Sequence, residues 1–233
     1  MTMLMEAAVA FLAIHLLISG TRLRDAITGA IGERPYLGLF SLASLAIIVW
    51  LIVAYNAAHT SPENRVLYDL GHVRDLGIPV VALAFLLGIQ GLLIRNPTAV
   101  QQEGMIGKDS VHGVVRITRH PFLWGLVLWS GFHLLANGDL ASVIFFGTFF
   151  VVALVGTFSI DAKRRWKLGP AWDSFAARTS NVPFGAAISG RNALHIGESL
   201  GWRFWVALLV FIALLFAHPH LFGASPFPGG WTP

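Results

Sequence analysis

The sequence predicts an all-α fold, a polytopic membrane bundle of about six transmembrane helices. Of its 233 residues, 55% are hydrophobic and only 12% are charged, whereas soluble domains carry about 25% charged residues. The mean hydropathy is +0.68. Several separate stretches are apolar enough to cross a bilayer. These observations exclude an ordinary soluble enzyme and predict the lipid bilayer as a partner.

The predicted spans follow one another along the chain, at or somewhat below the roughly 20 apolar residues that a crossing helix needs. They cover residues 4–20, 37–56, 77–94, 122–136, 140–160 and 203–217. The first span has no basic segment before it, so we expect a retained helix rather than a signal peptide. The fourth span is short and carries two tryptophans, two glycines and His133. It is therefore the least lipid-like span, which predicts an interior position.

The basic residues predict the orientation of these spans, because cytoplasmic loops are enriched in Lys and Arg. If six spans alternate, loops 21–36, 95–121 and 161–203 share one side and hold fourteen of the sixteen Lys and Arg residues. Only Arg65 and Arg74 fall on the other side. This asymmetry places both termini outside the cytoplasm. It also explains the net charge of +4 without a nucleic-acid partner.

Residues 1–222 are expected to form one bundle, with residues 161–202 as a cytoplasmic interfacial segment that contains an amphipathic stretch at 172–177. The turn-forming cluster Asn137-Gly138-Asp139 predicts a helical hairpin between the fourth and fifth spans. Residues 223–233 are rich in Pro, Gly and aromatic residues and are expected to form an irregular tail.

Two histidines inside predicted spans, His15 and His133, are candidate catalytic and metal-ligating residues. Burying an ionisable side chain in a membrane is costly, so each needs a reason to be there. Either one alone is equally compatible with a neutral histidine that hydrogen-bonds to a neighbouring helix. Together, two imidazoles in an aromatic-lined bundle are what axial ligation of haem requires. Their expected depths differ by about 10 Å, which helix tilt can reduce, and His218 is the fallback ligand.

The absence of cysteine narrows the possible cofactors further. It excludes disulfides, Cys-ligated zinc, iron–sulfur clusters and thiolate-ligated haem. A haem ligated by imidazoles is therefore the expected cofactor, with Trp129 as a candidate contact.

Arg116, Arg119 and His120 precede the fourth span and are candidate cofactor-binding residues. They are suited to an anionic group such as a haem propionate, a lipid phosphate or a cofactor carboxylate. The alternative is simple anchoring of a cytoplasmic loop. Asp161 is expected to pair with a neighbouring basic residue or with Arg119.

Taken together, motifs along nearly the whole chain resemble the NnrU family of polytopic membrane proteins, which includes cis-ζ-carotene isomerases. The motifs are Phe11-Leu-Ala-Ile-His15, Ser19-Gly-Thr-Arg-Leu-Arg-Asp25, Ile31-Gly-Glu-Arg-Pro35, Arg116-Ile-Thr-Arg-His-Pro121, His133-Leu-Leu-Ala-Asn-Gly-Asp139, Arg178-Thr-Ser-Asn-Val-Pro-Phe184 and Phe216-Ala-His-Pro219.

The resemblance implies a haem b protein in which His15 and His133 match the ligands of the isomerases. It also implies redox-linked isomerisation of an apolar, carotenoid-like polyene without net oxidation. Ser130, a further candidate cofactor-binding residue, stands where the isomerases carry a cysteine, so a ligand switch through thiolate is excluded. The closer match of the 133–139 turn to bacterial NnrU proteins implies a multi-pass protein of the cell inner membrane, with nitrogen-oxide metabolism in denitrification as the other possible role.

Two further functions stay open on the sequence alone. Arg119-His120-Pro121 with Gly169-Pro-Ala-Trp172 is similar to membrane methyltransferases that use S-adenosylmethionine on a lipid substrate. In those proteins a tyrosine follows the first motif, and here Phe122 replaces it. A non-catalytic accessory protein or nitric oxide sensor, acting as a homo-oligomer or in a membrane complex, is the other alternative.

Overall fold

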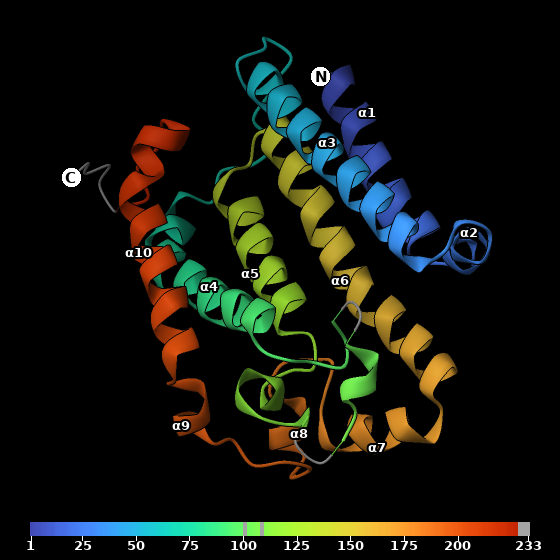
Figure 1. The fold of residues 1–233 in the computed structure, drawn as a ribbon. Helices are drawn as coiled ribbons and strands as arrows, with labels where there is room; N and C mark the ends of the chain where they lie inside the picture. The colour runs from blue at the N-terminus through green and yellow to red at the C-terminus, as the bar shows by residue number, and fades with distance from the viewer. Residues whose placement is uncertain (100–101, 108–109, 228–233) are drawn as a thin grey trace.

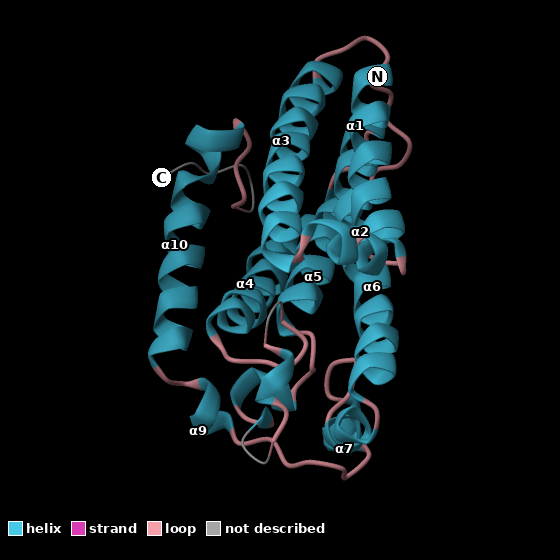
Figure 2. Ribbon diagram, turned by 45° about the vertical axis from the view of Figure 1, so that its right-hand side comes forward, coloured by secondary structure: helices cyan, strands magenta, loops and turns pink. Residues whose placement is uncertain are grey.

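The computed structural model describes residues 1–99, 102–107 and 110–227, and this part of the chain folds into helices joined by loops (Figure 2). Lys108 and residues 228–233 of the expected tail lie outside the described residues. The long helices are α1 (Thr2–Leu12) with the π-helix η1 (Ala13–Ile18), α3 (Glu33–His59), α4 (Gly77–Leu93), α5 (Pro121–Ala136), α6 (Leu140–Leu168) and α10 (Trp202–Phe222). The shorter ones are α2 (Leu23–Ile31), α7 (Pro170–Arg178), α8 (Gly185–Ile188) and α9 (Ile196–Ser199).

The all-helical membrane class is confirmed. Four helical segments of the described chain are long and apolar enough to cross a membrane: α3, Gly71–Leu93, α6 and α10. A fifth is added if α1, η1 and α2, which bend by 79° at residues 19–22, form one broken span. α5 is apolar but has only 16 residues. The count of six crossings and the side on which the termini lie stay predictions.

The helices pack in the lateral order α10, α4, α5, α6, α1 and α3. In Figure 1, the N-terminus and the end of α10 lie at the upper end of the bundle, whereas α7, α8 and α9 gather at the lower end. The predicted interior position of the fourth span is confirmed, because α5 packs between α4 and α6.

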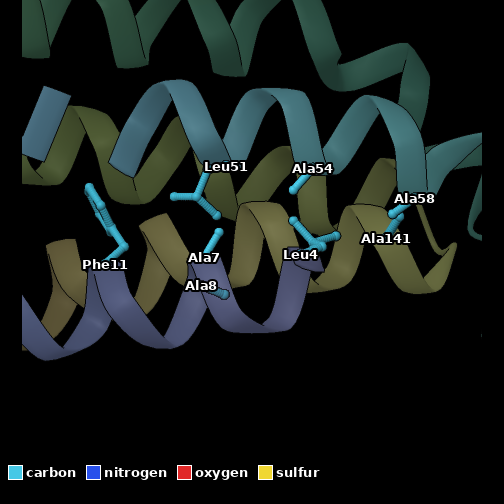
Figure 3. Packing of buried hydrophobic residues seen from close by; sticks show 8 residues of the cluster. All are labelled: Leu4, Ala7, Ala8, Phe11, Leu51, Ala54, Ala58 and Ala141. Carbon is cyan, nitrogen blue, oxygen red and sulfur yellow. The ribbon is translucent and has the colours of Figure 1, made fainter. Parts of the chain in front are cut away.

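Small side chains let α1, α3 and α6 approach closely. The buried cluster between them consists of Leu4, Ala7, Ala8, Phe11, Leu51, Ala54, Ala58 and Ala141 (Figure 3). Five of these eight residues are alanines, which is typical of helix interfaces in membranes, where close packing rather than water exclusion drives association.

The contact of α4 with α5 depends on Gly125. A Cβ atom at this position would lie 2.6 Å from the Ala84 carbonyl oxygen and 2.6 Å from Gly88 Cα. Only glycine therefore permits the two backbones to pack at this distance.

The predicted hairpin between α5 and α6 is confirmed. The Asp139 side chain caps α6 by accepting a hydrogen bond of 3.0 Å from the Ser142 backbone N–H. A Cβ on Gly138 would lie 1.9 Å from the Tyr68 carbonyl oxygen, so the loop of residues 60–70 closes tightly over this turn.

The helix α6 continues eight residues beyond the predicted end of its span at residue 160. Residues 161–168 are mostly Ala, Lys, Arg and Leu, which favour helix even after the apolar stretch stops. Gly169, with φ of +51°, ends the helix. α7 then forms the predicted amphipathic helix, with Trp172 and Phe175 fully buried.

Candidate functional site

His15 lies in the π-helical turn η1, a type of helix distortion that is frequent at functional sites. Its Nδ1 donates a hydrogen bond of 2.9 Å to the Phe11 carbonyl oxygen. The other ring nitrogen, Nε2, faces α3 and lies 3.4 Å from Ser44 Oγ. Because a carbonyl can only accept, the proton is on Nδ1 and the lone pair is on Nε2.

His133 repeats this arrangement on α5. Its Nδ1 donates a hydrogen bond of 2.7 Å to the Trp129 carbonyl oxygen, again four residues earlier in the chain. The imidazole stacks on Phe146 at 4.7 Å and lies 5.0 Å from the Trp129 ring. No hydrogen-bond partner of Nε2 is found among the described residues. Both histidines therefore hold the tautomer that metal-ligating histidines use, with the proton on Nδ1, and Nε2 of His15 has the Ser44 hydroxyl as its neighbour.

Aromatic rings connect the two histidines. Phe11 lies 4.1 Å from His15 and 5.2 Å from Phe149 of α6, measured between ring centroids. Phe149 lies 5.9 Å from Trp129, which in turn contacts His133. Trp129, predicted as a cofactor contact, thus lies beside His133 in the aromatic lining between the two histidine-bearing helices.

The two histidines differ in depth. α1 and α5 run in opposite directions, so His15 lies one turn beyond Phe11 and His133 one turn beyond Trp129 on the other side of Phe149 (Figure 1). Two such turns correspond to about 12 Å along the helix axes, close to the sequence-based expectation. The imidazole donors and the aromatic lining fit a haem. Both histidines can bind one iron only if the helices shift along their axes and remove this difference in depth.

The remaining predicted residues near His133 lie as follows. Ser130 is fully buried and donates a hydrogen bond of 2.6 Å to the Leu126 carbonyl oxygen of its own helix. His218 of α10 is within electrostatic range of His133, and its Nδ1 donates to the Ala224 carbonyl oxygen at 2.8 Å. His218 therefore also has Nε2 directed away from its hydrogen bond, as a fallback ligand requires.

Arg119 and His120 meet Asp161 at the start of α5. The Arg119 guanidinium donates to both carboxylate oxygens, with its shortest contact at 2.6 Å, and His120 Nε2 lies 2.7 Å from Oδ1. Asn181 Nδ2 adds a hydrogen bond of 3.1 Å. The expected pairing of Asp161 with Arg119 is confirmed. Burial lowers the pKa of His120 below its usual value, although the hydrogen bond to Asp161 opposes this.

Arg116 faces a different carboxylate. Its Nε and a terminal nitrogen donate to Glu198 of α9 at 2.8 and 3.1 Å, and the Gly113 N–H donates to the same carboxylate at 2.9 Å. The hydrogen bond from Arg116 lowers the pKa of Glu198 to about 2. All three predicted anion-binding residues thus already hold carboxylates of the chain, and His120 lies about 20 Å along α5 from His133. Their role in binding a cofactor stays a prediction.

A groove lies beside the Asp161 cluster, which consists of Asp161, Arg119, His120 and Asn181. Its volume is about 530 Å³, and it is lined mainly by residues of α7 and of the connection to α8, including Ser180 and Asn181. Arg119, Arg165 of α6 and Arg191 complete its polar lining.

The sequence analysis missed two residues of α3 that contact His15, and a third, Tyr36, that stacks on one of them. Ser44 contacts His15 Nε2, Phe40 lies edge-on to the imidazole at 5.3 Å, and Tyr36 stacks on Phe40 at 5.8 Å. Tyr36 is 5% exposed, and its hydroxyl is buried with no partner among the described residues. An unsatisfied buried hydroxyl costs about 1–3 kcal/mol. The spacing of four residues between Tyr36, Phe40 and Ser44 is the feature of the sequence that could have placed them on one face of α3.

Comparison with known proteins finds relatives that match almost the whole chain. The chain is 28% identical over 214 residues to the chloroplastic 15-cis-zeta-carotene isomerase of Arabidopsis thaliana, covering 87% of this chain and 56% of the relative. It is 26% identical over 217 residues to the enzyme of that name from Zea mays, covering 90% and 58%. The chain thus spans less than two thirds of the length of these relatives. No solved structure matches.

The family profile described as NnrU protein matches residues 3–226, which include both histidines, the Asp161 cluster and the α3 residues around His15. The chain therefore belongs to the NnrU protein family.

Proposed function

We propose that this protein is a haem b-binding isomerase of an apolar, carotenoid-like polyene. Its site lies in a bundle that crosses a bacterial inner membrane six times, with both termini outside the cytoplasm. The observation that carries the proposal is the matched pair of histidines: His15 and His133 each donate Nδ1–H to the carbonyl four residues earlier. The names of the two plant relatives supply the reaction class.

The side chains of the site have separable roles in this proposal. His15 and His133 would hold the iron of the haem, and the haem would supply a redox-dependent Lewis acid. The Phe11 and Trp129 carbonyl oxygens fix the imidazole tautomers and orient the rings. Phe146 and Phe149 present an apolar surface on which a flat polyene can lie, and they keep water away from it. The isomerisation rotates one double bond, so no atom or electron is gained or lost overall.

Optical spectra of the purified protein test the ligand assignment. The wild type is expected to show a Soret band that His15→Ala and His133→Ala each weaken or abolish. His59→Ala, at the exposed end of α3, is the matched control and should leave the spectrum unchanged. Unchanged spectra in both ligand variants would reject the assignment. Loss of the band in His218→Ala, with the band retained in His15→Ala, would assign the second ligand to His218 instead of His15.

Turnover tests the reaction. Under anaerobic conditions, the reduced, haem-loaded protein should isomerise the central 15-cis double bond of 15-cis-ζ-carotene to trans. The His133→Ala variant should not. Nitric oxide binding to the haem without conversion of the polyene would support the sensor or accessory role instead.

The groove beside Asp161 favours one second candidate, a lipid methyltransferase. It opens next to Arg119 and the 165–191 segment, where the methyltransferase resemblance would place the cofactor. Calorimetric titration with S-adenosylmethionine decides between the two, because a haem isomerase should give no heat of binding.

A further inference from the structure

The short helix α2 lies in the connection between two antiparallel helices that pack on each other, α1 and α3. It turns by 79° away from the axis of the segment Thr2–Ile18, and Figure 1 shows it leaving the bundle sideways beside the lower end of α3. α3 begins at Glu33, two residues after α2 ends. α2 therefore runs across the direction of the long helices, at the point where the chain turns back.

The sequence of α2 separates apolar from polar side chains. Leu23, Ile27 and Ile31 are spaced by four residues, and Ala26 and Ala30 lie beside them on the same face. Leu23 is 49% exposed and Ile31 is 43% exposed. Both alanines are exposed as well. α2 is thus an amphipathic helix whose apolar face is largely uncovered.

The polar side of α2 makes the contact with α3. The Arg24 guanidinium lies 5.4 Å from the centre of the Tyr36 ring and donates a hydrogen bond to the Glu33 carboxylate. At 100° per residue, Arg24 is about 90° around the helix from the centre of the apolar face. Packing against α3 therefore leaves the apolar face free for another surface.

Contacts with α6 give the depth at which α2 begins. The long uncharged stretch of α6 ends at Asp161, its first charged residue. On either side of this residue, the Ser159 hydroxyl donates to the Gly20 carbonyl oxygen at 3.2 Å, and the Lys163 ammonium group donates to the Ser19 carbonyl oxygen at 2.6 Å. The bend before α2 therefore lies at the level where α6 leaves its apolar stretch.

We propose that α2 lies in the plane of the membrane, with its apolar face buried at the boundary between lipid headgroups and acyl chains. Both ends of the helix are at the level of charged residues, Lys163 of α6 at its start and Glu33 and Arg34 of α3 at its end. An amphipathic helix at this level binds the interface through its apolar face. The exposed side chains of Leu39 and Leu42 continue the apolar surface along α3. The partner is therefore lipid of the same bilayer that α3 crosses.

This position of α2 also determines the depth of His15. The first crossing ends with η1, and α2 is not part of it. His15 lies three residues before the end of η1, so it is about one helical turn inside the interface. The inference does not depend on the proposed function, but it locates one of the two histidines in the bilayer.

Nitroxide labels on single cysteines test the position of α2, and the chain has no native cysteine to remove. The full chain is reconstituted in phosphatidylcholine vesicles. Paramagnetic resonance then compares collisions of each label with oxygen, which concentrates in lipid, and with a water-soluble nickel chelate. Labels at Leu23→Cys and Ile31→Cys should collide more with oxygen, and a label at Asp25→Cys more with nickel. The first two labels should lie at nearly the same depth, whereas a crossing helix would separate them by about 12 Å.

Leu45→Cys and Val53→Cys on α3 are the matched control pair, because both positions are also exposed and have the same spacing of eight residues. They lie along a helix that is long and apolar enough to cross the membrane, so their labels should differ in depth by about 12 Å. Ala26→Cys and Ala30→Cys repeat the measurement on the apolar face of α2 with a smaller change of side chain, in case the larger substitutions disturb folding.

Three results would overturn the proposal. A difference in depth between the Leu23 and Ile31 labels as large as in the control pair would show that α2 continues the first crossing. Preferential collision with nickel at both positions would place α2 in water. Labels that neither reagent reaches would show that a protein surface, such as a second copy of the chain, covers the apolar face. None of these results depends on the Soret band, so this proposal and the proposed function can fail separately.

Discussion

Lys163 of α6 holds the end of the π-helical turn that carries His15, through the 2.6 Å hydrogen bond to the Ser19 carbonyl oxygen. Ser159, one turn earlier on α6, donates to the next carbonyl, that of Gly20, at 3.2 Å. These two bonds satisfy carbonyl groups that the helix break after residue 18 leaves without helical partners. The rotation of His15 about the first span is therefore coupled to α6.

Removing this support should loosen the π-helical turn. Lys163→Met is expected to destabilise the apo-protein by about 1 kcal/mol, the net value of a typical hydrogen bond. It should also speed amide hydrogen exchange at residues 19–21. Lys163→Gln is the control, because its amide can still donate to the Ser19 carbonyl oxygen. Equal exchange rates in Lys163→Met and the wild type would show that α6 does not hold this turn.

Asp161 is expected to be essential for the lower end of the bundle. Asp161→Asn removes the charge that Arg119 and His120 share, and breaking a largely buried ion pair costs about 3–5 kcal/mol. Asp173→Asn breaks the exposed pair with Arg165, whose atoms lie 3.4 Å apart, and should change stability by less than about 0.5 kcal/mol. Thermal unfolding monitored by circular dichroism measures both. A similar effect of the two substitutions would contradict the central role of Asp161.

Acid should release α9 from residues 113–116, which precede α5. The pKa of Glu198 is about 2 in the folded protein, below its ordinary value of 4.5, because Arg116 and the Gly113 N–H donate to the carboxylate. A carboxylate whose pKa is depressed on folding stabilises the fold fully above the ordinary value. This contribution is lost as the pH falls from about 4.5 toward 2.

Hydrogen exchange at Gly113 should therefore accelerate through this pH range, after correction for the intrinsic exchange rate. Glu198→Gln should exchange fast at every pH and show no such transition. A transition that persists in Glu198→Gln would assign it to another group.

Replacing glycine by alanine should change stability in opposite directions at the α4–α5 contact and at an open position on α3. Gly125→Ala places a Cβ atom against the backbone of α4 and should cost about 1–3 kcal/mol through overpacking. Gly38→Ala, on α3, meets no atom within 4 Å and should stabilise the helix by up to about 1 kcal/mol, because alanine favours helix more than glycine. Unfolding in mild detergent compares the two, and a neutral Gly125→Ala would show that α4 and α5 pack less closely.

Much of the helical fold could be predicted from the sequence, because long apolar stretches are local signals. His15 and His133 could be identified for the same reason: each is a polar residue in an apolar run. The continuation of α6 to Leu168 could not be recognised from hydropathy, since charged residues favour helix outside the membrane as well as inside.

The partners of the site residues could not be predicted, because they depend on how helices are rotated. His15 lies in the π-helical turn at 13–18, which its sequence does not announce, and its ring meets Phe40 and Ser44 of α3. Similarly, Asp161 lies 42 residues after Arg119 and reaches it only because α5 and α6 are antiparallel neighbours.

The shortness of α5 has a consequence for the mechanics of the bundle. Its 16 residues correspond to about 24 Å, less than the roughly 30 Å of a hydrocarbon core. Such a hydrophobic mismatch usually deforms the surrounding lipid, but α4 and α6 flank α5 and take up most of its surface. An axial sliding of α5, carrying His133 with it, would thus be opposed mainly by side-chain repacking rather than by the elasticity of the bilayer.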